Sequence, residues 1–184
     1  GVVIDDHNGF KVTDDVEATA RLVQVVAKKY GADPKRLYST GQSMGCMITM
    51  YLAARHPDLF AAELLVSGQW DIKDLQPLAT QKFFYIAAGG DEKASGGQRE
   101  LLPVLQVQGV KVSTATWDAK KSYAALSRSA RQEIAQGNNI NFATFTKGSV
   151  LPAGVKDNNE HMYSFDHAYQ IAAVREWLFE QGRK

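Results

Sequence analysis

The spacing of apolar positions changes from segment to segment along the chain, and this change predicts alternating strands and helices. Residues 14–30 carry an apolar stripe at helical spacing, with acidic residues in the first turn and two lysines in the last. Strands that alternate with helices predict a mostly parallel, doubly wound α/β sheet. The predicted strands are 2–4, 36–40, 61–66, 82–88, 111–117 and 140–145, and the predicted helices are 14–30, 44–55, 98–108, 122–136 and 165–180.

The composition is that of an ordinary globular protein, and it narrows the function mainly by exclusion. Hydrophobic residues make up 45% of the 184 residues, charged residues make up 22%, and the net charge is +1. Because lysines and arginines are scattered, no nucleic-acid-binding surface is indicated. The histidines and the single Cys46 lack metal-ligand spacing, and Cys46 falls on a predicted buried helix. We expect one domain with no metal, cofactor or membrane span, and the composition leaves open whether the protein is secreted or cytoplasmic.

The most informative local pattern is Gly41-Gln42-Ser43-Met44-Gly45, which has the form G-x-S-x-G. A predicted strand leads into it and a buried helix follows it, the context of a nucleophile elbow. We expect both glycines to be required, because a Cβ at either position would collide with the neighbouring strand or helix. The free N–H groups and positive end of the helix would favour a developing oxyanion. A Gly-Ser turn without chemistry is the alternative.

A serine hydroxyl needs a histidine as base, and in α/β-hydrolases the chain order is nucleophile, acid, histidine. His7 and His56 lie before the serine or close behind it, so His161 and His167 remain as candidates. His161 follows the polar stretch 156–160, a loop of the kind that often carries catalytic groups. His167 is expected on the surface of the last helix. We therefore favour His161 as the base, and a loop histidine without a role is the alternative.

Asp91 is the favoured acid, because it follows the carboxyl end of the predicted strand 82–88. Ligands and catalytic groups of open α/β sheets gather at such strand ends. Asp71, after the preceding strand, is the rival, and Glu92 and Asp118 are weaker candidates. Asp91 would otherwise be a simple turn former after two glycines.

Several segments together resemble a serine-hydrolase family of predicted peptidases and esterases, which is related to polyhydroxybutyrate depolymerases and feruloyl esterases. The resemblance extends over almost the whole chain. It implies an α/β-hydrolase fold with Ser43 as nucleophile, Asp91 as acid, His161 as base and the backbone N–H of Met44 in the oxyanion hole. The segments that carry it are 36–45, 56–62, 68–71, 115–118, 145–152, 160–165, 168–169 and 177–181.

The chain departs from this family in front of the elbow. Members of the family carry two or more strands there, together with a His-Gly segment that supplies the other oxyanion N–H. Here only about forty residues precede Ser43, and no His-Gly pair occurs in the chain. We therefore expect residues 1–184 to be the C-terminal part of one α/β-hydrolase domain that lacks its first strands, with a missing N-terminal segment as partner. Such a sheet would have an unpaired edge.

The predicted function is hydrolysis of carboxylic esters, which would be short-chain, aryl or polymer-derived, through an acyl-enzyme. A serine peptidase with the same triad and a non-catalytic binding domain with this fold are the alternatives. Gln42 and Trp70 are candidates for the substrate pocket, although Trp70 would also suit the core. Part of 118–159 is expected to form a cap over the site, because this stretch is long for a link between acid and histidine.

Overall fold

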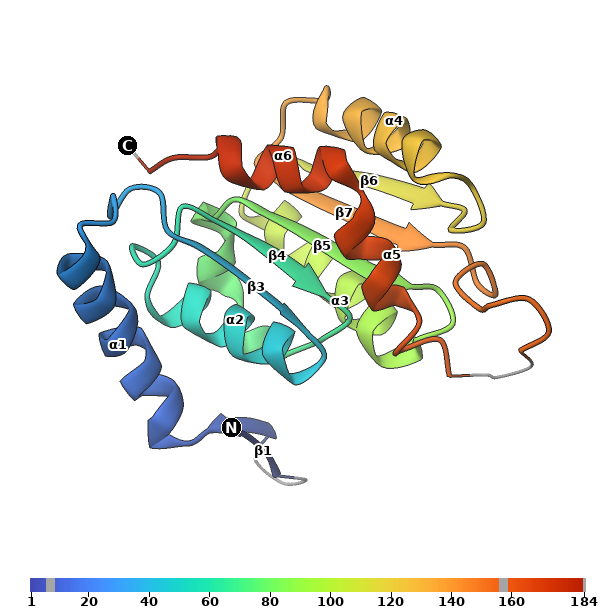
Figure 1. Cartoon of the computed structure of the whole chain (residues 1–184). Coiled ribbons are helices and arrows are strands. Elements are labelled where there is room, and N and C mark those ends of the chain that lie inside the picture. The colour runs from blue at the N-terminus through green and yellow to red at the C-terminus, as the bar shows by residue number, and fades with distance from the viewer. Residues whose placement is uncertain (6–8, 156–158, 184) are drawn as a thin grey trace.

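The computed structural model describes residues 1–5, 9–155 and 159–183 (Figure 1). Five strands form one parallel sheet in the order β3-β4-β5-β7-β6, and β1 and β2 form a separate antiparallel hairpin. The described elements are β1 (Val2–Asp5), β2 (Gly9–Val12), α1 (Asp14–Tyr30), β3 (Tyr38–Gln42), α2 (Met44–Arg55), β4 (Ala62–Val66), two short 3-10 helices (Ile72–Asp74 and Gln76–Thr80), β5 (Phe83–Ala88), α3 (Glu92–Val107), β6 (Val112–Trp117), α4 (Tyr123–Ile134), β7 (Ile140–Phe145), α5 (Ser164–Gln170) and α6 (Ala172–Glu180).

Helices cover both faces of the five-stranded sheet (Figure 1). Helices α2 and α3 pack on one face, against a core that includes Phe83 and Tyr85 of β5. Helices α4, α5 and α6 pack on the other face, where Phe84 meets Trp177 edge to face at 5.2 Å between ring centroids. Successive residues of a strand point to opposite faces, so a strand buried on both sides must be apolar throughout. The mostly parallel, doubly wound sheet is thus confirmed.

Two helices differ from their predicted bounds for local reasons. Helix α3 begins at Glu92 instead of residue 98, because the Asp91 carboxylate accepts a hydrogen bond from the Ala94 N–H at 3.2 Å and caps the helix. The predicted C-terminal helix is divided into α5 and α6 at Ile171, whose ψ of 102° is not helical. Within the described residues, no helix is long and apolar enough to cross a membrane.

The N-terminal hairpin and the open edge of the sheet lie at the N-terminal side of the fold. Strand β2 was not predicted from the sequence, because its four residues include a glycine and a lysine and none of them is fully buried. In the part of the chain that the structure describes, β3 pairs with β4 only, so the sheet is open beside the strand that leads into Ser43. An unpaired edge is what the sequence leads us to expect of a sheet that lacks its first strands.

The stretch 118–159 largely belongs to the layered fold. Helix α4 packs against α6 and β6, and β7 lies inside the sheet between β5 and β6. Strands β6 and β7 end side by side at the carboxyl edge of the sheet, and the described residues of this stretch that line a cavity there, Lys147, Gly148, Leu151 and Asn159, all follow β7. The loop after β7 therefore remains the candidate for a cap.

The turn between β3 and α2 has a backbone conformation that few side chains adopt. Ser43 has φ 53° and ψ −122°, and its N–H donates to the carbonyl of Val66 at 3.0 Å. A Cβ on Gly41 would overlap the backbone of Gly45 and Cys46, so glycine is required there. A Cβ on Gly45 would have open space around it. The expectation that both glycines are needed is therefore wrong for Gly45.

Glu63 in β4 and Glu133 in α4 are buried, and neither carboxyl oxygen of either residue has a hydrogen-bond partner among the described residues. Burial raises the pKa of each carboxyl from 4.5 to about 8, because the charged form loses its hydration. Between these two pH values the folded chain keeps protons that the unfolded chain releases. The free energy of unfolding therefore falls as the pH rises through this window.

We expect Glu63→Gln to flatten this pH dependence. At pH 8 the unfolded wild type is favoured because it releases the Glu63 proton, and glutamine has no such proton to release. Tm of the variant should therefore be higher by at least roughly 2–4 °C, the shift produced by about 1 kcal/mol in a domain of this size. At pH 5 the difference in Tm should be much smaller, because the window has only begun and little of the stability that the wild type loses across it has yet been lost. Thermal unfolding at both pH values checks this, with the exposed Glu100→Gln as control. An unchanged difference between pH 5 and pH 8 would contradict it.

Gly41→Ala and Gly45→Ala form a matched pair that tests the packing of the turn. The first should lower Tm by roughly 4 °C or more, since forcing one methyl group into a filled space costs about 1–3 kcal/mol. The second should leave Tm unchanged or raise it slightly, because alanine favours a helix and nothing obstructs its Cβ. Melting curves of the two variants decide the matter, and equal destabilisation would show that the turn is packed differently.

Candidate active site

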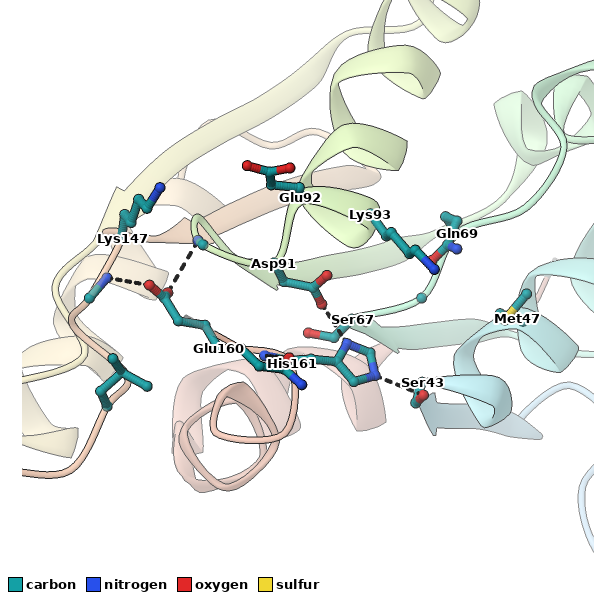
Figure 2. A pocket seen from close by; sticks show the side chains of 15 residues that line it. Ser43, Met47, Ser67, Gln69, Asp91, Glu92, Lys93, Lys147, Glu160 and His161 are labelled. Atoms are coloured by element: carbon teal, nitrogen blue, oxygen red, sulfur yellow. Dashed lines mark hydrogen bonds and ion pairs between the residues drawn. The ribbon is translucent and has the colours of Figure 1, made fainter. Parts of the chain in front are cut away.

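Three of the predicted site residues come together at the carboxyl ends of the parallel strands (Figure 2). His161 Nε2 lies 2.8 Å from Ser43 Oγ, and His161 Nδ1 lies 2.5 Å from Asp91 Oδ2. Ser43 follows β3, Asp91 follows β5, and His161 lies in the segment between β7 and α5. One imidazole thus links a hydroxyl to a carboxylate, although 118 residues separate His161 from Ser43.

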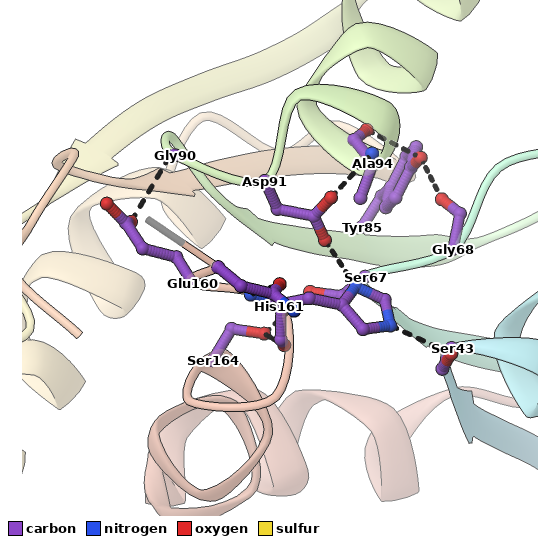
Figure 3. Close-up of polar contacts among 11 residues, drawn as sticks. Ser43, Ser67, Gly68, Tyr85, Gly90, Asp91, Ala94, Glu160, His161 and Ser164 are labelled. Atoms are coloured by element: carbon purple, nitrogen blue, oxygen red, sulfur yellow. Dashed lines mark hydrogen bonds and ion pairs between the residues drawn. The ribbon is translucent and has the colours of Figure 1, made fainter. Parts of the chain in front are cut away.

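The Asp91 carboxylate is fixed through both of its oxygens (Figure 3). Oδ1 accepts a hydrogen bond from the Ala94 N–H at the start of α3, and Oδ2 is hydrogen-bonded to His161 Nδ1. The side chain is only 7% exposed, and the N-terminal end of α3 favours its negative charge. An aspartate held in this way can fix the tautomer of His161 with the proton on Nδ1, which leaves Nε2 to accept the proton of Ser43.

The backbone around the serine is braced by a buried tyrosine. The Tyr85 hydroxyl is shared between the carbonyl oxygens of Gly68, in the loop after β4, and Ala94, in the first turn of α3 (Figure 3). Burial raises the pKa of Tyr85 well above its ordinary range, so the hydroxyl stays a neutral donor. Gly68 itself lies so close to Cys46 and the Ser43 carbonyl that a Cβ would not fit.

The rival candidates lie elsewhere and have other partners. The Asp71 carboxylate accepts the Phe10 N–H at 2.7 Å and ties the N-terminal hairpin to the body of the protein. His167 is partly buried against the rings of Tyr123 and Phe145, so the expected surface position is wrong. His7 and residues 156–158 of the polar loop lie outside the described residues. Within the described residues, the imidazole is hydrogen-bonded to neither Glu92 nor Asp118: Glu92 lines the cavity, and Asp118 accepts the Lys120 N–H at 3.0 Å.

A cavity of about 1090 Å³ opens in front of Ser43 and His161. Neither Gln42 nor Trp70, the two predicted pocket residues, is among the described residues that line it. Gln42 lies exposed at the end of β3. Trp70 is buried in the core, where its ring packs against Phe10 and Tyr51, so its assignment to the substrate pocket is wrong. The walls include Met47, Ser67, Gln69, Glu92, Lys93, Lys147, Leu151 and Glu160.

Ser67 is a site residue that sequence reasoning missed. It follows β4, is fully buried and has φ 48°. Its Oγ lies 2.6 Å from Ser164 Oγ, and Ser164 in turn donates to the His161 carbonyl at 2.9 Å. A polar residue directly after a buried strand was the signal available, the same signal that indicated Asp91.

Met44 is the first residue of α2 and directly follows Ser43. The first backbone N–H groups of an α-helix have no acceptor within the helix, so the Met44 N–H is available beside the serine hydroxyl. Its side chain is 52% exposed and takes no part in the core. Among the residues that the structure describes, no group of three His, Cys, Asp or Glu side chains is arranged to hold a metal ion.

Comparison with known proteins places the chain in a family. A family model described as "Putative esterase" matches residues 14–144, which include Ser43 and Asp91. Acetylxylan esterase A of Aspergillus ficuum is 42% identical over 62 residues, which are 34% of this chain and 20% of that protein. Feruloyl esterase B of Talaromyces stipitatus is 40% identical over 62 residues, 34% of this chain and 16% of that protein.

The crystal structure of a thermostable esterase is similar to this chain in fold. The match has a TM-score of 0.65 and 20% identity, and it covers 91% of this chain and 36% of the other. The matched segment thus spans about a fifth of the length of the curated acetylxylan esterase, and the structural match spans about a third of the solved structure. Since the family model spans most of the chain, the protein belongs to the esterase family that it represents.

Proposed function

We propose that the protein hydrolyses carboxylic esters through an acyl-enzyme, with Ser43 as nucleophile, His161 as general base and Asp91 as the acid that orients it. The observation that carries this proposal is the continuous pair of hydrogen bonds from Ser43 through His161 to Asp91, 2.8 and 2.5 Å long. Membership of the esterase family and the names of the acetylxylan and feruloyl esterases support an ester substrate.

Each group has a proposed role in this reaction. Ser43 Oγ attacks the ester carbonyl while His161 Nε2 takes its proton, and the resulting imidazolium is stabilised by the buried Asp91 carboxylate. The Ser43 oxygen forms a bond to the carbonyl carbon, the alcohol leaves with the proton returned by His161, and water then releases the acid by the same route. The carbonyl oxygen becomes negative in the transition state, and in this proposal the Met44 N–H at the positive end of α2 donates to it.

The second oxyanion donor is, we propose, supplied by an N-terminal segment of the same domain. This extends the family resemblance, in which a His-Gly segment before the elbow provides this N–H. The open edge of β3 supports it, because further strands of the sheet would pair there. Loss of one such donor costs about a hundredfold or more in rate, so activity should be measured on the intact protein.

The cavity supports a substrate with a bulky or extended group attached to the ester. Its volume of about 1090 Å³ exceeds what a short acyl chain requires, and its wall mixes apolar Met47 and Leu151 with polar Gln69 and Lys93. We propose that short-chain or aryl acyl groups on a larger alcohol, including one derived from a polymer, are the substrate class.

Ser43→Ala should abolish both ester turnover and covalent labelling. Removal of the nucleophile costs about a thousandfold or more in kcat. Release of p-nitrophenol from a short-chain ester and the mass shift produced by a fluorophosphonate measure the two effects. Hydrolysis of peptides without hydrolysis of esters would favour a peptidase. Wild-type protein that neither labels nor turns over either substrate would favour a non-catalytic binding domain.

Asp91→Asn and Asp91→Ala should separate catalysis from helix capping. Asparagine can still accept the Ala94 N–H, but it offers an amide to His161, so kcat should fall by about 10³- to 10⁴-fold while Tm stays near that of the wild type. Alanine should lose a similar factor in kcat and in addition lower Tm by roughly 2–4 °C, because the cap contributes about 1 kcal/mol. Kinetics and melting curves measure both, and full activity of Asp91→Asn would exclude Asp91 as the acid.

A further inference from the structure

Glu160, the residue before His161, has a buried carboxylate that joins two other loops of the site. Its Oε1 accepts the Gly148 N–H at 2.6 Å, and its Oε2 accepts the Gly90 N–H at 3.2 Å (Figure 2). The side chain is 3% exposed. Gly90 lies directly before Asp91, and Gly148 belongs to the loop after β7. One carboxylate therefore connects the loop of the acid, the loop after β7 and the loop of the histidine.

The carboxylate of Glu160 points away from the imidazole, so it is not an alternative acid (Figure 3). Each of its oxygens receives a backbone N–H, which satisfies a buried carboxylate without a cation. A Cβ on Gly90 would occupy the space of the Glu160 carboxylate, so a larger residue at position 90 would displace that carboxylate. The contact is thus a close packing of Glu160 against the backbone that carries Asp91.

The other side of His161 is held independently. Ser164 donates to the His161 carbonyl at 2.9 Å, and its hydroxyl pairs with Ser67 Oγ at 2.6 Å. The histidine is therefore fixed from both sides, by Glu160 before it and by Ser164 after it. If Glu160 is altered, the brace at Ser164 still holds the segment near the sheet. We expect a local displacement of His161 relative to Asp91 instead of a loss of the fold.

We propose that Glu160 is a positioning residue that sets the distance between His161 and Asp91. The proposal rests on the proposed function, because it concerns the same imidazole and carboxylate. A misplacement of about 1 Å in a catalytic group can cost about a hundredfold in rate, even when the changed residue does not touch the substrate. Although Glu160 lies in the cavity wall, both of its carboxyl oxygens are occupied by the Gly90 and Gly148 N–H groups, so we expect its loss to act mainly on kcat and to change KM little.

Glu160→Gln in the intact protein is the test variant. Glutamine has the same shape, but it offers only one acceptor oxygen and turns an N–H₂ group toward one of the two backbone N–H donors. With p-nitrophenyl acetate as substrate, we expect kcat to fall by about 10- to 100-fold and KM to change by less than about threefold. Glu133→Gln is the matched control, since it makes the same change at a buried glutamate far from the site and should leave kcat unaltered.

The hydrogen-bonded Nδ1 proton of His161 provides a readout that does not depend on turnover. In the proton NMR spectrum of the wild type it should give a far-downfield resonance, because it lies between His161 and Asp91. In Glu160→Gln this resonance should broaden or move, whereas in Glu133→Gln it should not. If Glu160→Gln does not fold, Glu160→Asp, which keeps the carboxylate and is one methylene shorter, is measured in the same way.

The outcomes separate this proposal from the proposed function. Wild-type kcat and an unchanged Nδ1 resonance in a folded Glu160 variant, with or without a lower Tm, would overturn the positioning role and leave the triad untouched. A wild-type protein that hydrolyses no ester would contradict the proposed function. The resonance would then still decide whether Glu160 sets the contact between His161 and Asp91.

Discussion

The site depends on one imidazole that must satisfy two distances at once. His161 can link Ser43 to Asp91 only if its Nε2 and Nδ1 are both within hydrogen-bond distance of their partners, and 70 residues separate it from the nearer of the two in sequence. A loop residue has no regular hydrogen-bond ladder to fix it. The remaining contacts of the site therefore serve largely to hold three loops in one relative position.

The parallel sheet provides the first part of that constraint. Strands that run in the same direction end at the same edge, so β3, β4, β5 and β7 bring Ser43, Ser67, Asp91 and the loop after Phe145 together. The spacing between these strand ends is set by backbone hydrogen bonds and does not depend on the side chains of the site. Side-chain contacts then provide the finer adjustment, through the cap of α3 by Asp91 and the shared hydroxyl of Tyr85.

Sequence reasoning located the residues whose signals are local. Ser43 has its glycine motif, Asp91 follows an apolar strand, and His161 remains after the chain order excludes two other histidines. It failed where the deciding contact comes from a distant segment. Trp70 follows a strand end and suited either the pocket or the core, and its contacts with Phe10 and Tyr51 decide for the core. Gly45 carries the motif, yet only Gly41 meets another part of the backbone.

The three buried glutamates show why such contacts decide what a residue does. Glu63, Glu133 and Glu160 are all at most 3% exposed, and no sequence pattern separates them. Glu63 and Glu133 have no hydrogen-bond partner, so burial raises their pKa to about 8 and they cost stability when they ionise. Glu160 is buried to the same depth, but each of its carboxyl oxygens accepts a backbone N–H. Whether a buried acid lowers the stability of the fold or joins its loops therefore depends on the backbone N–H groups that lie beside it.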